Sequence, residues 1–114
     1  MEIFTLDIKS DMPPASVACA NLEIEIERLS KTNIKLIKVI HGYGSHGVGG
    51  KIKRQMNTML LRLLHDKKIK NFVNGEKLNE EFIKNNLLYE NYPQLILDAD
   101  LKNYNSGVSL IFLN

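Results

Sequence analysis

The residues best suited to chemistry gather in residues 39–51, which hold five of the seven glycines and two of the three histidines. Glycine lets a ligand approach the backbone closely, so this segment can present its N–H groups to a bound molecule. An apolar run at residues 34–40 precedes the segment, and a helical pattern follows it. We therefore expect the segment to join a strand to a helix N-terminus, a junction that favours anions. The candidate binding residues are Gly42, Tyr43, Gly44, Ser45, His46, Gly49, Gly50, Lys51, Lys53 and Arg54.

His41 and Asp7 form the candidate acid/base pair. His41 follows the apolar run, and Asp7 stands near the end of an earlier apolar run at residues 3–8. If the two runs are neighbouring parallel strands, both residues reach the same edge of the sheet, where an Asp and a His could act as acid and base. In the alternative interpretation, the two side chains only fix the glycine segment through hydrogen bonds. The sequence leaves both interpretations open.

Nucleotide-binding motifs match only in part. Glycines with the G-x-G-x-x-G spacing of a dinucleotide fingerprint begin at Gly42, after a strand and before a helix. The next strand, however, ends in Asn74 rather than in an acid, and the chain is too short for two βαβ halves. A Walker A loop fails because Ile52, not Ser or Thr, follows Lys51. Nucleotide binding is therefore a less favoured alternative.

Metal binding and nucleophilic catalysis have little support in the sequence. His41 and His46 lie in the glycine segment, but neither a cysteine pair nor a carboxylate cluster completes a set of metal ligands. Ser45 beside His46 has no orienting acid nearby in the sequence. No cofactor is evident from these patterns, and they leave open whether a divalent metal is required.

Positive charge is concentrated in the middle of the chain. Residues 28–70 carry eleven Lys and Arg against one acid, a net charge of +10, whereas residues 1–27 carry −5 and residues 71–114 carry −3. Cations at the start of a helix oppose its macrodipole, so we favour a bound polyanion over the alternative of a merely solvated surface. We predict that four cations form one exposed face near the glycine segment: Lys51, Lys53, Arg54 and Arg62.

Hydrophobic periodicity predicts one α/β domain over residues 1–114, with a mixed sheet and helices packed on it. The alternation at residues 22–27 also fits a strand, but apolar residues at helical spacing continue over four turns and favour a helix. The last apolar run predicts a strand buried on both faces. The predicted order is β-α-β-α-β-(α)-β, with strands at residues 3–8, 35–40, 69–73 and 108–113 and helices at about residues 13–30, 50–67 and 79–91.

The compartment is predicted from three features of the sequence. No window approaches the run of about 18 apolar residues that a membrane span needs, and the N-terminus lacks a signal-peptide pattern. The single cysteine, Cys19, falls in a helical pattern and is expected to be a small buried residue. We expect a cytoplasmic protein with no membrane partner.

Two segments resemble motifs of the Smr (small MutS-related) domain. Val39-Ile40-His41-Gly42-Tyr43-Gly44, followed by the basic helix, is similar to its HGxG motif, and residues 105–113 are similar to its last strand, often written G-V-T-x-V. The resemblance implies a two-layer α/β sandwich with a mixed four-stranded sheet, like the C-terminal domain of a bacterial translation initiation factor. It also implies nucleic-acid binding and, in several members, nicking or endonuclease activity on DNA or RNA.

The first family motif, LDxH, is altered in this chain. It reads Leu6-Asp7-Ile8-Lys9, so a lysine occupies the position of the family's first histidine. With an ordinary pKa of about 10.4, Lys9 could contact phosphate but could not act as a base at neutral pH. Residues 74–104 are also longer than the family's usual connection, and we expect them to add a helix over one face of the sheet.

Two hypotheses follow from the sequence and the resemblance. The first is a phosphodiester endonuclease that uses Asp7 and His41, with Lys9 and the loop amides stabilising charge on the phosphate. The second is a module that binds nucleic acid, or associates with the ribosome, without catalysis. The sequence does not distinguish DNA from RNA, or a duplex from a single strand.

Overall fold

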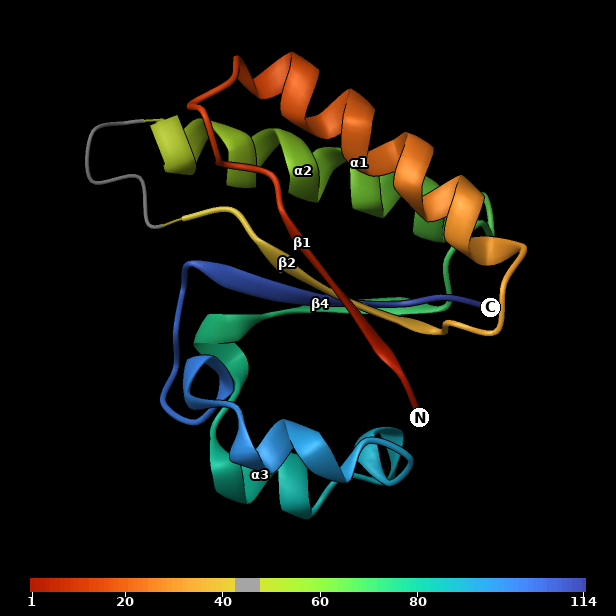
Figure 1. The fold of residues 1–114 in the computed structure, drawn as a ribbon, viewed down its shortest axis with the longest axis vertical. Helices are drawn as coiled ribbons and strands as arrows, with labels where there is room; N and C mark the ends of the chain where they lie inside the picture. Colours follow the sequence, from red (N-terminus) through yellow and green to blue (C-terminus); the bar gives the residue numbers. More distant parts are fainter. Residues whose placement is uncertain (43–47) are drawn as a thin grey trace.

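A mixed four-stranded sheet forms the centre of the molecule in the computed structural model, which describes residues 1–42 and 48–114 (Figure 1). The strand order across the sheet is β1-β2-β4-β3. β1 and β2 are parallel, whereas β4 is antiparallel to both of its neighbours. This confirms the predicted α/β class with a mixed sheet. The strands are β1 (Ile3–Asp7), β2 (Leu36–Ile40), β3 (Asn71–Asn74) and β4 (Val108–Phe112).

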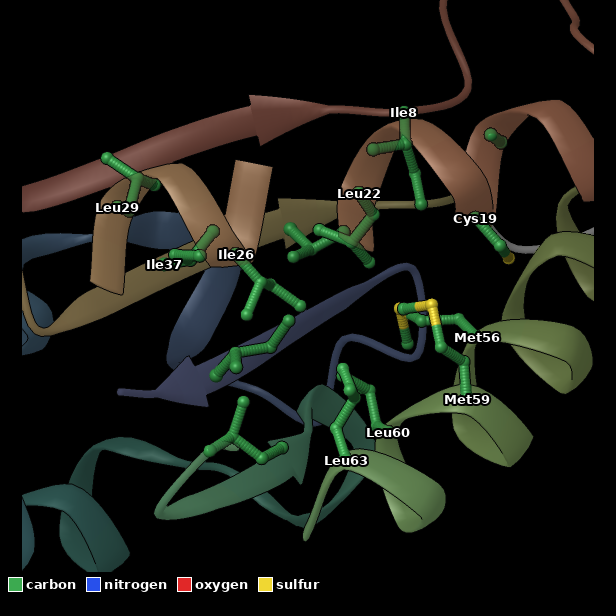
Figure 2. Packing of buried hydrophobic residues seen from close by; sticks show 14 of the residues in the cluster. Ile8, Cys19, Leu22, Ile26, Leu29, Ile37, Met56, Met59, Leu60 and Leu63 are labelled. Carbon is green, nitrogen blue, oxygen red and sulfur yellow. The ribbon is translucent and has the colours of Figure 1, made fainter. Parts of the chain in front are cut away.

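Helices α1 (Ala15–Ser30) and α2 (Val48–His65) cover one face of the sheet and pack against each other. Figure 1 shows both helices on the same side of the strands. The helical interpretation of residues 22–27 is confirmed, since Leu22 and Ile26 are buried one turn apart while Ile24 is 63% exposed. Figure 2 shows the core that the two helices form with the sheet; its members include Leu22, Ile26, Leu29, Ile37, Met56, Leu60 and Ile111.

Short helices cover the second face, so the sheet has helical layers on both sides (Figure 1). Residues 74–104 were expected to add a helix here, and they supply α3 (Glu80–Lys84) together with four turns of 3₁₀ helix. Their buried side chains form a second core with β2 and β4: Leu36, Leu78, Ile83, Tyr89, Leu95, Leu101, Leu110 and Phe112. The 3₁₀ helices are η1 (Gly75–Lys77), η2 (Leu87–Tyr89), η3 (Pro93–Leu97) and η4 (Ala99–Leu101).

Helix α3 is shorter than the sequence predicts. Asn79 caps it as expected, because its Oδ1 accepts a hydrogen bond from the backbone N–H of Phe82 at 2.7 Å. The predicted extension to about residue 91 is wrong, since the helix ends at Lys84. Asn86 accepts from the N–H of Leu88 at 2.9 Å and begins η2, so a local side-chain hydrogen bond replaces the next helical turn.

The predicted final strand is confirmed, because all five residues of β4 are buried between the two layers. Among the described residues, no helix has both the length and the apolar character needed to cross a membrane.

Candidate functional site at the carboxyl edge of the sheet

The site is built where β1 and β2 end, because parallel neighbours finish at the same edge of a sheet. The backbone N–H of Ile8 donates to the carbonyl of Ile40 at 3.0 Å, which fixes the two strand ends side by side. We call this edge, where the glycine segment also begins, the carboxyl edge (Figure 1). The N–H groups of His41 and Gly42 both donate to the carbonyl of Gly107 at 3.0 Å. Gly42 has a φ of 82°, so a residue without a Cβ is favoured there.

His41 lies at the start of a buried polar row that crosses three strands. Its ring has no exposed surface, and its Nε2 lies 2.9 Å from Oγ of Ser109 in β4. Ser109 donates its hydroxyl proton to Oδ1 of Asn74, at the end of β3, over 2.6 Å. Because a hydroxyl has one proton to donate, Nε2 of His41 must be the donor toward Ser109. His41 therefore holds the strand ends together through hydrogen bonds.

The pKa of His41 is lowered from its ordinary value of 6.5, chiefly because burial disfavours the charged ring. The nearby Lys53 ammonium lowers this pKa further. The Gly42 carbonyl, 3.1 Å from Nδ1, opposes the shift, because with Nε2 as the donor it can accept a hydrogen bond from Nδ1 only when the ring is protonated. The imidazole is therefore neutral at pH 7.

We expect stability to fall as the pH drops below about 6.5, because His41 takes up a proton more readily in the unfolded chain than in the folded protein. The loss begins near the unfolded pKa and ends at the lower folded pKa. Its slope is at most about 1.4 kcal/mol per pH unit for one group. Urea unfolding of wild type and His41→Asn between pH 7.5 and 5.5 should give a flatter dependence for the variant.

The matched control for this pH dependence is His65→Asn, because the side chain of His65 is 90% exposed on the last turn of α2. This control should retain the wild-type slope. Equal slopes for wild type and His41→Asn would contradict the assignment of the pH dependence to His41.

Asp7 shares the carboxyl edge with His41 but does not contact it. Asp7 is the register partner of Ile40, whose side chain packs toward the short helices, whereas His41 reaches Ser109 on the face that α2 covers. Successive strand residues face opposite sides, so the one-residue offset separates the two side chains. Both residues are described in the structure, and no hydrogen bond joins them. The acid/base pair that the sequence suggested is therefore not assembled in this structure.

The Asp7 carboxylate instead organises the turn that follows β1. Its Oδ1 accepts hydrogen bonds from the backbone N–H groups of Lys9 and Ser10, both at 3.0 Å. The Lys9 ammonium lies 3.8 Å from the other carboxylate oxygen, and the Lys9 side chain is 47% exposed. Lys9 is thus accessible at the carboxyl edge, as a phosphate contact requires.

Lys53 is not an available cation. Its Nζ donates to both carboxylate oxygens of Glu76 at 2.8 Å and to the carbonyl of Ser106 at 3.1 Å. The Lys53 side chain is 17% exposed, so this ion pair joins α2 to η1 and to the segment before β4. The prediction that Lys53 belongs to an exposed phosphate-binding face is wrong. Two positions along a helix turn the side chain by about 200°, which carries Lys53 to the opposite flank from Lys51.

Lys51 and Arg54 keep the position that the sequence predicts. Both are exposed near the start of α2, and neither forms an ion pair with a described residue. Arg62 is also exposed, but it lies near the far end of α2 and binds Glu23 of α1 at 2.6 Å. Of the four cations predicted to form a single exposed face, only Lys51 and Arg54 are therefore exposed at the carboxyl edge and unpaired with any described residue.

Most of the remaining basic residues lie at the opposite edge. α1 and α2 both run away from the carboxyl edge, so their C-terminal ends meet at the other end of the sheet (Figure 1). Cations complement helix C-termini, which explains the placement of the residues at the helix ends, Arg28, Lys31 and Arg62, without a ligand. The prediction that positive charge surrounds the glycine segment is therefore wrong for these residues: Arg28, Lys31, Lys35, Arg62, Lys67, Lys68 and Lys70.

The other predicted binding residues divide into two groups. Gly49 and Gly50 lie in the first turn of α2. Tyr43, Gly44, Ser45 and His46 lie outside the described residues. Within residues 1–42 and 48–114, no three His, Cys, Asp or Glu side chains are grouped as metal ligands.

Sequence reasoning missed three polar residues at this edge. Two belong to the buried row through His41, and the third is the acid that pairs with Lys53. Ser109 interrupts an apolar strand, which was the available signal for a buried hydrogen-bonding partner. Asn74 was noted only as the residue that ends the third strand. Glu76 carried no signal, because its partner Lys53 is 23 residues away in the chain.

Comparisons with protein-family models, with curated proteins and with solved structures each found no match to this chain. The resemblance to the Smr domain therefore stays a prediction, which rests on the two sequence motifs alone.

Proposed function

We propose that the chain binds nucleic acid, and that phosphate groups lie against the N-terminal end of α2. The observation that carries this proposal is the placement of Lys51 and Arg54. Both cations are exposed, and in the described part of the chain neither has an acidic partner. They stand at the positive end of an 18-residue helix whose first turn contains no acid. Cations in this position are unfavourable alone and are stabilised by a bound polyanion.

The surroundings of these two cations support a phosphate site. The polar row through His41 holds the start of the glycine segment, and the Lys53–Glu76 ion pair fixes the flank of α2. Both features are buried or neutralised, so they support the binding surface without competing for phosphate. Lys9 adds a third accessible cation at the same edge.

Binding without cleavage fits this geometry better than a nuclease that uses Asp7 and His41. A general base must reach the proton that it removes, and His41 has no exposed surface. Its Nε2 is already hydrogen-bonded to Ser109, and Asp7 is bonded to the turn after β1. The Smr resemblance points in the same direction, since Lys9 replaces the histidine of its first motif. We expect this binding to occur in the cytoplasm, as the sequence predicts.

The test is the salt dependence of binding to labelled duplex DNA, single-stranded DNA and structured RNA. Fluorescence anisotropy measures the binding. In duplex binding, each neutralised phosphate contributes about −0.9 to the slope of log K against log salt. Replacing Lys51 and Arg54 by Ala should therefore make the slope shallower by up to about two units and weaken binding at every salt concentration.

The matched control is Lys68→Ala combined with Lys70→Ala. This variant also removes two exposed cations, but from the opposite edge of the sheet. It should retain the wild-type slope. An equal loss in both variants would show unspecific attraction by net charge, and a larger loss in the control would move the binding surface to the opposite edge. Nicking by the wild type that His41→Asn abolishes would overturn the proposal of binding without cleavage.

A further inference from the structure

An open cavity with both polar and apolar lining lies beside the carboxyl edge, between α3 and the segment that precedes β4. Its volume is about 400 Å³, which is in the usual range for a site that holds a small ligand. Two large aromatic side chains line it, Phe82 from α3 and Tyr104 from the segment before β4. The remaining lining is polar and includes Lys77, Glu81 and Asn85.

The two aromatic rings are exposed but held in place. Phe82 is 44% exposed, and its ring meets the buried ring of Tyr89 edge to face at 6.2 Å. Tyr89 in turn meets Phe112 of β4 at 5.7 Å, so a chain of aromatic contacts anchors Phe82 to the sheet. An exposed ring that already packs on a buried ring is suited to stack on a planar ligand, because less conformational entropy is lost on binding.

Tyr104, in the segment before β4, is anchored by hydrogen bonds. It is 54% exposed, yet its backbone N–H donates to the carbonyl of Leu78 at 2.8 Å. Its hydroxyl accepts a hydrogen bond from the Asn79 side chain at 2.7 Å. The hydroxyl proton remains available to a ligand, since the hydroxyl oxygen is the acceptor in that contact.

Further polar groups in the cavity are available for recognition. The Asn85 amide has no hydrogen bond, and Glu81 has no ion pair, to any residue in the described part of the chain. The Asn86 oxygen accepts from Leu88, which leaves its amide N–H groups free toward described residues. Donors and acceptors of this kind match the edge of a nucleobase, and Lys77 can contact an adjoining phosphate.

The lining of the cavity is linked along the chain to the two partners of Lys53 in α2. Lys77 directly follows Glu76, which binds Lys53 of α2 at 2.8 Å. Tyr104 stands two residues before Ser106, whose carbonyl accepts from the same Lys53 ammonium at 3.1 Å. In Figure 1 the segment before β4 and the start of α2 lie at the same end of the sheet.

We infer that this cavity binds one unstacked nucleobase of a single-stranded nucleic acid, between Phe82 and Tyr104. The inference rests on the proposed function, and it selects single strands over duplexes because a paired base cannot enter the cavity. Aromatic rings hold the face of the base, the amides of Asn85 and Asn86 contact its edge, and the backbone continues toward Lys51 and Arg54.

The experiment compares two labelled oligonucleotides of equal length, a mixed-sequence DNA strand and an abasic strand with the same phosphates. Stacking one base on aromatic rings is worth a factor of about 5 to 150 in affinity. We expect the wild type to prefer the strand with bases by a factor in this range. The variant Phe82→Leu with Tyr104→Leu keeps apolar bulk, so it should keep the fold, and it should bind both strands equally with an unchanged salt slope.

A matched control removes two other exposed apolar side chains of the same layer, Leu87→Ala with Leu97→Ala. These side chains are 81% and 77% exposed and lie outside the cavity, so the preference for bases should persist. Asn85→Asp tests the cavity without touching an aromatic ring, and the added negative charge should reduce binding of the strand with bases.

The outcomes separate the inference from the proposed function. Equal, salt-dependent binding of both strands by the wild type would overturn the base-binding cavity and leave the phosphate site intact. Absence of binding to either strand would overturn the base-binding cavity, and it would overturn the proposed function as well if labelled duplex DNA and structured RNA also stay unbound. A preference for bases that survives Phe82→Leu with Tyr104→Leu would place base recognition elsewhere on the molecule.

Discussion

Replacing Asp98 and Asp100 together by Asn should lower the free energy of unfolding by about 2 to 3 kcal/mol. These carboxylates accept hydrogen bonds from the Lys38 ammonium at 2.7 and 2.8 Å. Lys38 is in the central strand β2 and is only 7% exposed, so the double variant leaves a buried charge without an anion. Breaking a buried pair from one side costs about 3 to 5 kcal/mol. We expect less here because Asp98 and Asp100 are 28% and 49% exposed.

The control for this prediction is Lys38→Met, which keeps the length of the side chain and removes its charge. Removing the cation leaves only the more exposed carboxylates, so this variant should lose less stability than the double Asn variant. Adding Lys38→Met to the double variant should restore part of the loss, as urea unfolding would measure. Three substitutions whose effects simply add would contradict the ion-pair explanation.

The Lys38 cluster also shows why charge counted along the sequence overestimated the basic surface. Three of the cations in residues 28–70 are paired by acids from distant segments: Glu23 binds Arg62, Glu76 binds Lys53, and Asp98 and Asp100 bind Lys38. Such partners are set by the tertiary fold and have no pattern in the sequence. Helical spacing could have separated Lys53 from Lys51, because two positions along a helix point to different flanks.

The strands and long helices were predictable because each has a clear period. The alternation and length of the apolar runs located all four strands, and the i, i+4 spacing of Leu22 and Ile26 identified α1. The layer at residues 75–101 has no such period, since it consists of short helical turns, two of which, η2 and η4, begin at local side-chain caps from Asn86 and Asp98.

The sequence was enough to predict which edge of the sheet holds the candidate site, but not which side chains are in contact there. Parallel pairing of β1 and β2 brings Asp7 and His41 to the same edge, as the sequence suggested. Whether their side chains meet depends on the register, and a shift of one residue reverses the face. The sequence does not encode this register in any local pattern, so the contact between His41 and Ser109 required the structure.

Gly75→Ala should destabilise the protein by about 3 kcal/mol. This is the second large effect that we expect, beside that of replacing Asp98 and Asp100. A Cβ at this position would lie 2.0 Å from the carbonyl oxygen of Asn105 and 2.7 Å from that of Val108. Both neighbours are backbone atoms, which cannot move aside as a flexible side chain can. Overpacking of this kind costs about 1 to 3 kcal/mol, and we expect the upper end because the approach is so close.

The measurement is urea unfolding of Gly75→Ala beside Gly50→Ala. Gly50 lies in the first turn of α2, where replacing glycine by alanine favours the helix by up to about 1 kcal/mol. The same chemical change should therefore stabilise the protein at one position and destabilise it at the other. Because Gly75 directly precedes Glu76, displacement of η1 should also weaken the contact of Glu76 with Lys53. The double variant Gly75→Ala with Glu76→Gln should therefore lose less stability than the sum of the losses in the two single variants. Equal stability of Gly75→Ala and wild type would show that the segment before β4 can withdraw from η1, and the close approach would then not be what fixes Glu76 at the carboxyl edge.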